Sequence, residues 1–177
     1  TEGFSGWYYI QNGCVQKGQE TVKQNSNGWW YIGTDGKVDF HKNTVAPNEY
    51  GWWAVRNGAV DFQLNGIASN ESGDWYCRGG QVDFGAAGVL ESETEGFSGW
   101  YYIQNGCVQK GQETVKQNSN GWWYIGTDGK VDFGFSGIAS NENGTWYIEN
   151  GKVNFTYSGT YEDENGRIYD IKSGNVA

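Results

Sequence analysis

Short runs of aromatic and β-branched residues alternate with polar residues along this chain, and pairs of such runs flank dipeptides that favour tight turns. In GTWYIENGKVNF, for example, two runs flank Asn150-Gly151. Asn-Gly supplies the positive φ angles of a two-residue hairpin turn, and side chains alternate faces along a strand. The pattern predicts a β-hairpin that pairs Ile148 with Val153. It also places Trp146 and Phe155 on the same face as this pair, the face that each hairpin buries.

The hairpin pattern recurs with a period of 22 or 23 residues, and each copy opens with a glycine. These glycines are Gly6, Gly28, Gly51, Gly73, Gly99, Gly121, Gly144 and Gly166. A lone hairpin is marginal in water, so each one must bury a face against its neighbours. We therefore predict an all-β fold, a β-solenoid of about eight stacked hairpin repeats. Residues 1–40 recur unchanged as 94–133, so we expect one array over 1–177 with two halves of four repeats, 1–93 and 94–177.

The connectors between hairpins share a second pattern. LNGIASNESG and FSGIASNENG carry an Ile-Ala step followed by Asn-Glu shortly before a glycine. We expect the step to add a short extended segment to the common core and the Asn-Glu pair to form a turn. The segment Gly28–Phe40 has one residue more than its counterparts, which predicts a three-residue loop with Gly36 in the left-handed conformation.

Composition excludes several classes of partner. The net charge is −9, whereas nucleic acids and anionic membranes select basic surfaces. No apolar run approaches the roughly 20 residues of a membrane span, so we expect no membrane insertion. The chain has no signal peptide and no Met, so we expect it to be a mature part of a longer protein with other domains.

Few residues suggest catalysis or metal binding. The single histidine, His41, begins a connector without a nucleophile pattern around it, and we predict no catalytic residue. The acidic segment YEDENG lacks the ligand spacing of a calcium loop, and we predict no metal and no cofactor. Cys14 and Cys107 are the same position in the two halves, too far apart to bridge, and Cys77 takes a core position. We expect three free thiols.

The aromatic residues are the more informative signal, and they divide by face. The second tryptophan of each hairpin shares a face with Ile, Val and Phe, which predicts core packing. The first tryptophan lies on the other face, where it either packs against the next repeat or forms an exposed ladder of rings. Exposed rings would stack on sugars or enclose a quaternary ammonium. The ligand-contact candidates on this face are Trp29, Tyr31, Trp52, Trp122 and Tyr124.

The pattern GWWYI…DGKVDF…GIAxNENG-WYI…NGKVNF resembles the aromatic cell-wall-binding repeats of Gram-positive surface proteins, which include choline- and glucan-binding repeats. The GWWYV-type tandem repeats are the most similar group. The resemblance implies stacked hairpins and a non-catalytic module that anchors a secreted or surface protein to a cell-wall polymer or glycan. Choline-binding repeats carry Gly-Trp where these connectors carry Gly66-Ile67 and Gly137-Ile138, which argues against choline and leaves the ligand open. The alternative is a structural spacer or protein-interaction stalk whose aromatic residues all serve packing.

Overall fold

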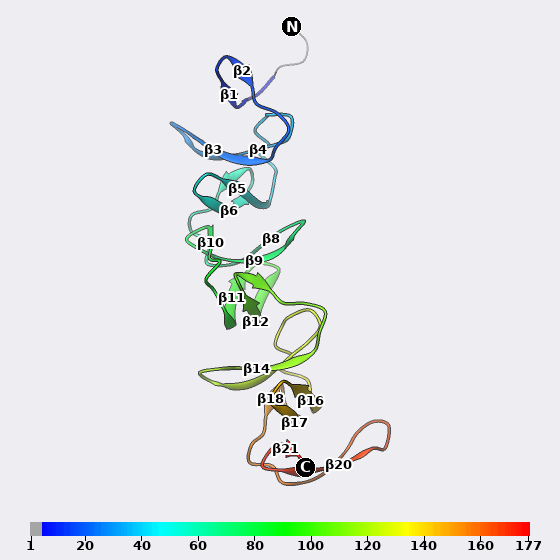
Figure 1. The fold of residues 1–177 in the computed structure, drawn as a ribbon. Helices are drawn as coiled ribbons and strands as arrows, with labels where there is room; N and C mark the ends of the chain where they lie inside the picture. The colour runs from blue at the N-terminus through cyan, green and yellow to red at the C-terminus, as the bar shows by residue number, and fades with distance from the viewer. Residues whose placement is uncertain (1–4) are drawn as a thin grey trace. The chain divides into compact units, whose positions relative to one another are not determined.

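The computed structural model describes residues 5–177, and among these residues it contains β-strands, turns and no helix, which confirms the all-β prediction (Figure 1). No helix that could cross a membrane exists in this part of the chain. The strands are β1 (Ile10–Gln11), β2 (Cys14–Val15), β3 (Thr21–Asn25), β4 (Gly28–Ile32), β5 (Thr44–Asn48), β6 (Gly51–Arg56), β7 (Ala59–Val60), β8 (Gly66–Asn70), β9 (Gly73–Arg78), β10 (Gln81–Val82), β11 (Gly88–Thr94), β12 (Phe97–Gln104), β13 (Cys107–Val108), β14 (Thr114–Asn118), β15 (Gly121–Ile125), β16 (Gly137–Asn141), β17 (Gly144–Glu149), β18 (Lys152–Val153), β19 (Gly159–Glu162), β20 (Ile168–Lys172) and β21 (Asn175–Val176).

The chain folds as two compact units. One comprises the chain up to Phe84 together with Glu93–Phe97, and the other comprises Gly85–Ser92 and Ser98–Ala177. Within the first unit the hairpins β3–β4, β5–β6 and β8–β9 follow one another, and within the second β14–β15, β16–β17 and β19–β20 do so (Figure 1).

A typical repeat is a meander of three strands, as β5, β6 and β7 illustrate. The connector strand β5 pairs with β6 over five residue pairs, and the turn between them is Glu49-Tyr50. The strand β6 then pairs with β7 through Val55 and Val60, around Asn57-Gly58. The connector strand and its turn were both expected from the sequence, and both are confirmed. The connector contributes the longer of the two hairpins, because its five pairs outnumber the two around the Asn-Gly turn.

The tight hairpin is present in all eight repeats of the described chain. The predicted register is confirmed for Ile148 and Val153, which are partners. In the second repeat the longer loop is also confirmed, since Ile32 bridges to Val38 and Gly36 has a φ of 81°.

Successive repeats are joined because the tight turn of one repeat docks on the long strand of the repeat before it. The Tyr31 N–H donates to the Gly58 carbonyl oxygen at 2.8 Å, and the Ala54 N–H donates to that of Gly80 at 2.7 Å. Gly58 has a φ of 76°, and a Cβ there would overlap the carbonyl oxygen of Asp39 in the preceding repeat. Glycine at this position is therefore needed for the turn and also for the close approach of two repeats.

Both faces of a hairpin are used in packing. In one core cluster, Val22 and Tyr31 of the second repeat pack with Trp53 and Val55 of the third. The aliphatic positions of the predicted core face are buried in repeats two to seven, as Ile148 (0% exposed) illustrates, whereas Ile10 of the first repeat is 59% exposed.

The expected burial of the repeat phenylalanines is wrong. Phe155 is 45% exposed and its four equivalents are similar, because pairing ends at Val153 and the chain turns at the phenylalanine. The ring therefore lies at the surface, against Trp146.

Candidate functional site

Five clusters of three aromatic rings lie at junctions between successive repeats in the described chain. Each cluster, which we call a ring triad, combines the first tryptophan of one repeat with the second tryptophan and the phenylalanine of the next. Triad 1 is Trp7, Trp30 and Phe40; triad 2 is Trp29, Trp53 and Phe62; triad 3 is Trp52, Trp75 and Phe84; triad 4 is Trp100, Trp123 and Phe133; triad 5 is Trp122, Trp146 and Phe155. All 10 tryptophans of the chain belong to a triad.

The rings of a triad stand steeply to one another. In triad 5 the Trp122 and Trp146 centroids are 5.0 Å apart, and Phe155 lies 5.8 Å from Trp122 and 5.7 Å from Trp146. The three interplanar angles are 62°, 89° and 71°. Three such planes form the walls of a cup. A flat stacking platform would need rings that are nearly coplanar.

An asparagine at the end of the connector strand fixes the second tryptophan of each triad. The Trp146 indole N–H donates to Asn141 Oδ1 at 3.0 Å, and the Asn143 N–H donates to the same oxygen at 2.9 Å. The Asn141 amide also donates to the carbonyl of Val115 in the preceding repeat. The equivalent indole–asparagine pairs are Trp30 with Asn25, Trp53 with Asn48, Trp75 with Asn70 and Trp123 with Asn118. The indole ring is thus held in place without a ligand.

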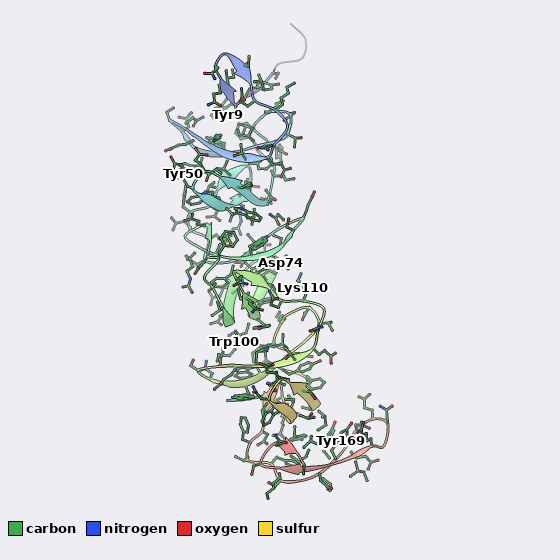
Figure 2. All side chains as sticks on the ribbon, viewed as in Figure 1. Tyr9, Tyr50, Asp74, Trp100, Lys110 and Tyr169 are labelled. Carbon is green, nitrogen blue, oxygen red and sulfur yellow. The ribbon has the colours of Figure 1, made fainter. Side chains whose placement is uncertain are left out.

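The cups open to solvent. The phenylalanines of the triads are between 39% and 48% exposed, and the first tryptophans are partly exposed, Trp7 most of all at 41%. The second tryptophans are deeper, with Trp53 at 9% and Trp123 at 8%. The second tryptophan is buried in triads 2 and 4 and half-buried in triads 1, 3 and 5. The other two rings of each triad are accessible, and Trp100, labelled in Figure 2, is an accessible wall of triad 4.

The structure divides the sequence-predicted contact residues into two groups. Trp29, Trp52 and Trp122 are each the first tryptophan of a triad. Tyr31 and Tyr124 are 3% and 5% exposed and are not walls of a triad. Their rings continue the contact between repeats inward from the triads. On this face of the hairpin the tyrosines therefore pack between repeats, and the first tryptophans are partly exposed.

The two buried tyrosines lie beside carboxylates of the connectors. Burial raises the pKa of Tyr124 to about 12, and the neighbouring Glu113 carboxylate adds to the shift. Burial and Glu20 raise the pKa of Tyr31 in the same direction. Asp39 and Asp132 raise the pKa of Tyr31 and of Tyr124, respectively, more weakly.

Sequence reasoning missed the second tryptophans and the phenylalanines as site residues, because they share a face with Ile and Val and were assigned to the core. The composition of the repeats contained a usable signal. Asp74 and Thr145 replace the first tryptophan in the fourth and seventh repeats, and both hydrogen-bond a serine of their own hairpin instead. A position that alternates between tryptophan and small polar residues is not a pure core position.

The acidic loop of the last repeat uses its carboxylate internally. Asp163 accepts hydrogen bonds from the N–H groups of Asn165 and Arg167 and from the Tyr169 hydroxyl. The bond from the Arg167 backbone lowers the pKa of Asp163 most. The carboxylate therefore closes the loop. The three cysteines are free thiols, as predicted, and Cys77 is fully buried.

Comparison with known proteins identifies the repeat. The family model of the choline-binding repeat matches residues 5–16, 42–61, 65–83, 98–109 and 134–154. No curated protein matches the chain by sequence.

Solved structures to which this chain is similar include three proteins of Streptococcus pneumoniae. CbpJ is 19% identical, with 96% of this chain and 56% of that chain covered and a TM-score of 0.39. Choline binding protein F is also 19% identical, with 96% and 55% covered and a TM-score of 0.38. The modular autolysin LytC, solved with a synthetic peptidoglycan ligand, is 14% identical, with 99% and 46% covered and a TM-score of 0.40. This chain spans about half the length of these structures.

The matched segments fall in both halves of the array and include at least one tryptophan of every ring triad but none of the triad phenylalanines. Repeats of this family form non-catalytic binding modules. These segments of the chain therefore match the choline-binding repeat.

Proposed function

We propose that the ring triads bind quaternary ammonium groups, of the kind that choline substituents present on a cell-wall polymer, and that the module anchors a secreted or surface protein to the wall. The single observation that carries this proposal is the cup of three steep rings, built five times from the same positions. Trp29, Trp52 and Trp122 remain proposed contacts, now joined by their triad partners. The two halves, 1–93 and 94–177, are proposed to act as one array.

The size of the cup suits a small cation. A cation is attracted to an aromatic face from within about 6 Å of the ring centroid. The centroids of triad 5 form a triangle with sides of 5.0, 5.8 and 5.7 Å. A nitrogen about 5 Å from all three centroids would lie roughly 4 Å above their plane, which is within the attractive range of every ring. The three methyl groups of a trimethylammonium would then face the ring walls.

The missing Gly-Trp step of the connectors does not remove the cup. In this chain the third wall comes from the phenylalanine that follows the tight hairpin, such as Phe62 in triad 2 or Phe84 in triad 3. A different ring at the same junction therefore takes the place of the tryptophan that Ile67 and Ile138 replace, and choline stays the proposed ligand.

A sugar ligand fits the geometry less well, because sugar faces stack on exposed, flat ring surfaces. The interplanar angles within the triads lie between 56° and 89°, so the rings offer a corner. The charge of the chain also favours a cation, since a net charge of −9 raises the local concentration of cationic groups. Several weak sites on one chain would raise the overall affinity for a polymer that carries many ligands.

Titration with choline, monitored by calorimetry and by tryptophan fluorescence, tests the proposal. Because every tryptophan is in a triad, the fluorescence reports on these sites. The neutral isostere 3,3-dimethylbutan-1-ol has the same shape without the charge and serves as the ligand control. We expect choline to shift the emission with about five sites per chain, and the isostere to bind far more weakly. Muropeptides and glucans are titrated in parallel.

Two variants separate contact from packing. Trp52→Ala should remove one site and leave the other sites intact, whereas Tyr31→Phe, outside the triads, should leave all sites intact. A flat response to choline, or an equal response to the isostere, would reject the cation site. A flat response to every ligand would favour the spacer, in which the rings serve only packing.

A further inference from the structure

We propose that the ring triads are unequal in affinity, and that the residue behind the second tryptophan, Lys152 for triad 4 and Ala59 for triad 1, sets the difference. This inference rests on the proposed function, because it concerns how strongly each triad holds a quaternary ammonium. Lys152 lies outside the three rings, so it would set the affinity of the site for its ligand without touching the ligand.

Triads 1 and 4 form a matched pair within one chain. Residues 1–40 and 94–133 are identical, and each block contains all three rings of its triad. Trp30 and Trp123 are therefore the same position in the same local sequence, and each donates its indole N–H to the same asparagine position. The following repeat is not identical, and it supplies the residue that pairs with the second tryptophan.

That residue differs in charge between the two copies. Ala59 pairs with Trp30, whereas Lys152 pairs with Trp123. The Lys152 Nζ lies 5.0 Å from the centroid of the Trp123 ring, within the range of a cation–π contact. The lysine stem runs over Gly121, where an added Cβ would overlap its Cε. A glycine stands at the same place in the first copy, Gly28, and no lysine covers it.

On this proposal the lysine and the ligand use opposite faces of one indole, because they reach it from different repeats. Trp100 of triad 4 comes from the preceding repeat, whereas Lys152 comes from the following one, so the two approach Trp123 from opposite sides. The ammonium on one face draws the π electrons of the ring toward itself, so the attraction of a second cation to the other face is weaker. The ligand and the lysine also repel each other. The Lys152 Nζ and the ligand nitrogen would be about 9–10 Å apart. With an effective dielectric constant between those of a protein surface and water, we expect the affinity of triad 4 for the ligand to be about 3- to 10-fold lower than without the lysine.

Two other triads have a neutral residue behind the second tryptophan. Gln81 stands behind Trp53 of triad 2, and Asn175 stands behind Trp146 of triad 5, and both are neutral. Triad 2 has an additional ring, because Tyr50 projects from the β5–β6 turn and lies 6.0 Å from Trp29 (Figure 2). Among the described residues, triad 4 is thus the one triad in which a lysine lies over the second tryptophan. We expect it to fill after triad 1.

The test is a choline titration of the whole chain labelled with 5-fluorotryptophan. The ¹⁹F resonance of each tryptophan is assigned from the variant in which that one tryptophan is replaced by phenylalanine. The Trp30 resonance should reach half-saturation at about 3- to 10-fold lower choline than the Trp123 resonance. Lys152→Gln should bring Trp123 close to Trp30, and Ala59→Lys should move Trp30 toward Trp123. Lys172→Gln removes the same charge from an exposed strand of the same unit and should change neither. Because Lys152 is exposed, the difference should shrink as salt is added.

The outcomes separate the two proposals. If no tryptophan resonance responds to choline, the proposed function fails and this inference fails with it. If the resonances respond but Trp30 and Trp123 titrate together, or if Lys152→Gln leaves Trp123 unchanged, the function stands and the role of Lys152 is rejected. Thermal unfolding of each variant checks that a changed titration does not come from a changed fold, and the reciprocal variants keep the test decisive if one of them is unstable.

Discussion

Substitution of the turn glycine at a repeat junction tests how the array holds together. Gly151 forms the tight turn of the seventh repeat and has a φ of 77°. A Cβ at this position would overlap the Asp132 carbonyl oxygen and lie 2.7 Å from the Phe133 Cα, both in the preceding repeat. Gly111 provides the matched control in the same unit, because it has a φ of 90° and nothing lies within 4 Å of an added Cβ. The two alanine variants differ mainly in whether the new methyl group meets a neighbouring repeat.

The expected magnitudes follow from this difference. An alanine in the left-handed region costs about 1–2 kcal/mol, and both variants carry that cost. Overpacking against backbone that must shift costs typically about 1–3 kcal/mol more, and only Gly151→Ala carries it. We expect a loss in the free energy of unfolding of about 1–2 kcal/mol for Gly111→Ala and about 2–5 kcal/mol for Gly151→Ala. The N–H of Tyr124 donates to the Gly151 carbonyl at 2.8 Å, so a shifted turn also weakens the bond that joins the two repeats.

The free energy of unfolding of both variants is measured by urea titration, monitored by far-UV circular dichroism and by tryptophan fluorescence. Two probes are needed because a repeat array can unfold in parts, and a single transition must be shown before a free energy is assigned. Equal losses for the two variants would refute the view that the tight turn docks on the preceding repeat. A Gly151→Ala protein that unfolds in two steps, with the repeats before the junction intact, would support it further.

Three other predictions address the core, the buried tyrosine and the support of a triad. Burial raises the pKa of Cys77 to about 12, so Cys77 should resist a thiol reagent such as DTNB at pH 8 until urea is added, while the exposed Cys14 reacts at once. The pKa of Tyr124 is raised to about 12 from its ordinary 10.0, so the unfolded chain loses the phenolic proton first as the pH rises. The free energy of unfolding should therefore hold below about pH 10 and fall as the pH rises toward 12. Thermal unfolding across this pH range checks the prediction, and Tyr124→Phe should flatten the fall. Asn141→Ala removes three hydrogen bonds, including that from the Trp146 indole, and should lower the free energy of unfolding by about 1–3 kcal/mol in a urea titration and weaken choline binding at triad 5.

Much of the fold could be predicted from the sequence because it depends on local chemistry. A glycine-containing pair with positive φ angles is required at each two-residue turn, and alternation fixes which side chains share a face, so the pairing of Ile148 with Val153 followed directly. The three-residue loop at Gly36 followed from a one-residue difference in length. These features need no knowledge of any other repeat.

The composition of the site could not be predicted in this way because it depends on contacts between repeats. Alternation places Trp29 and Trp53 on opposite faces of their own hairpins, and within one hairpin that separation is correct. Stacking brings the opposite faces of two neighbouring hairpins together, so the two rings meet with centroids 5.1 Å apart. The end of pairing after Val60 then lets Phe62 turn toward both rings, which a strict two-residue period does not anticipate.

A triad is therefore a property of a junction and not of a repeat, since one repeat supplies one wall and its successor supplies two. This division explains how an exact duplication of residues 1–40 can yield sites that are not equivalent. Copying a block preserves the three rings, as triads 1 and 4 illustrate, but the residue behind the second tryptophan comes from the repeat beyond the copied block. That repeat has diverged, with alanine in one place and lysine in the other. Substitutions at this position can then tune each site separately, without any change in the rings or in the hairpins that hold them.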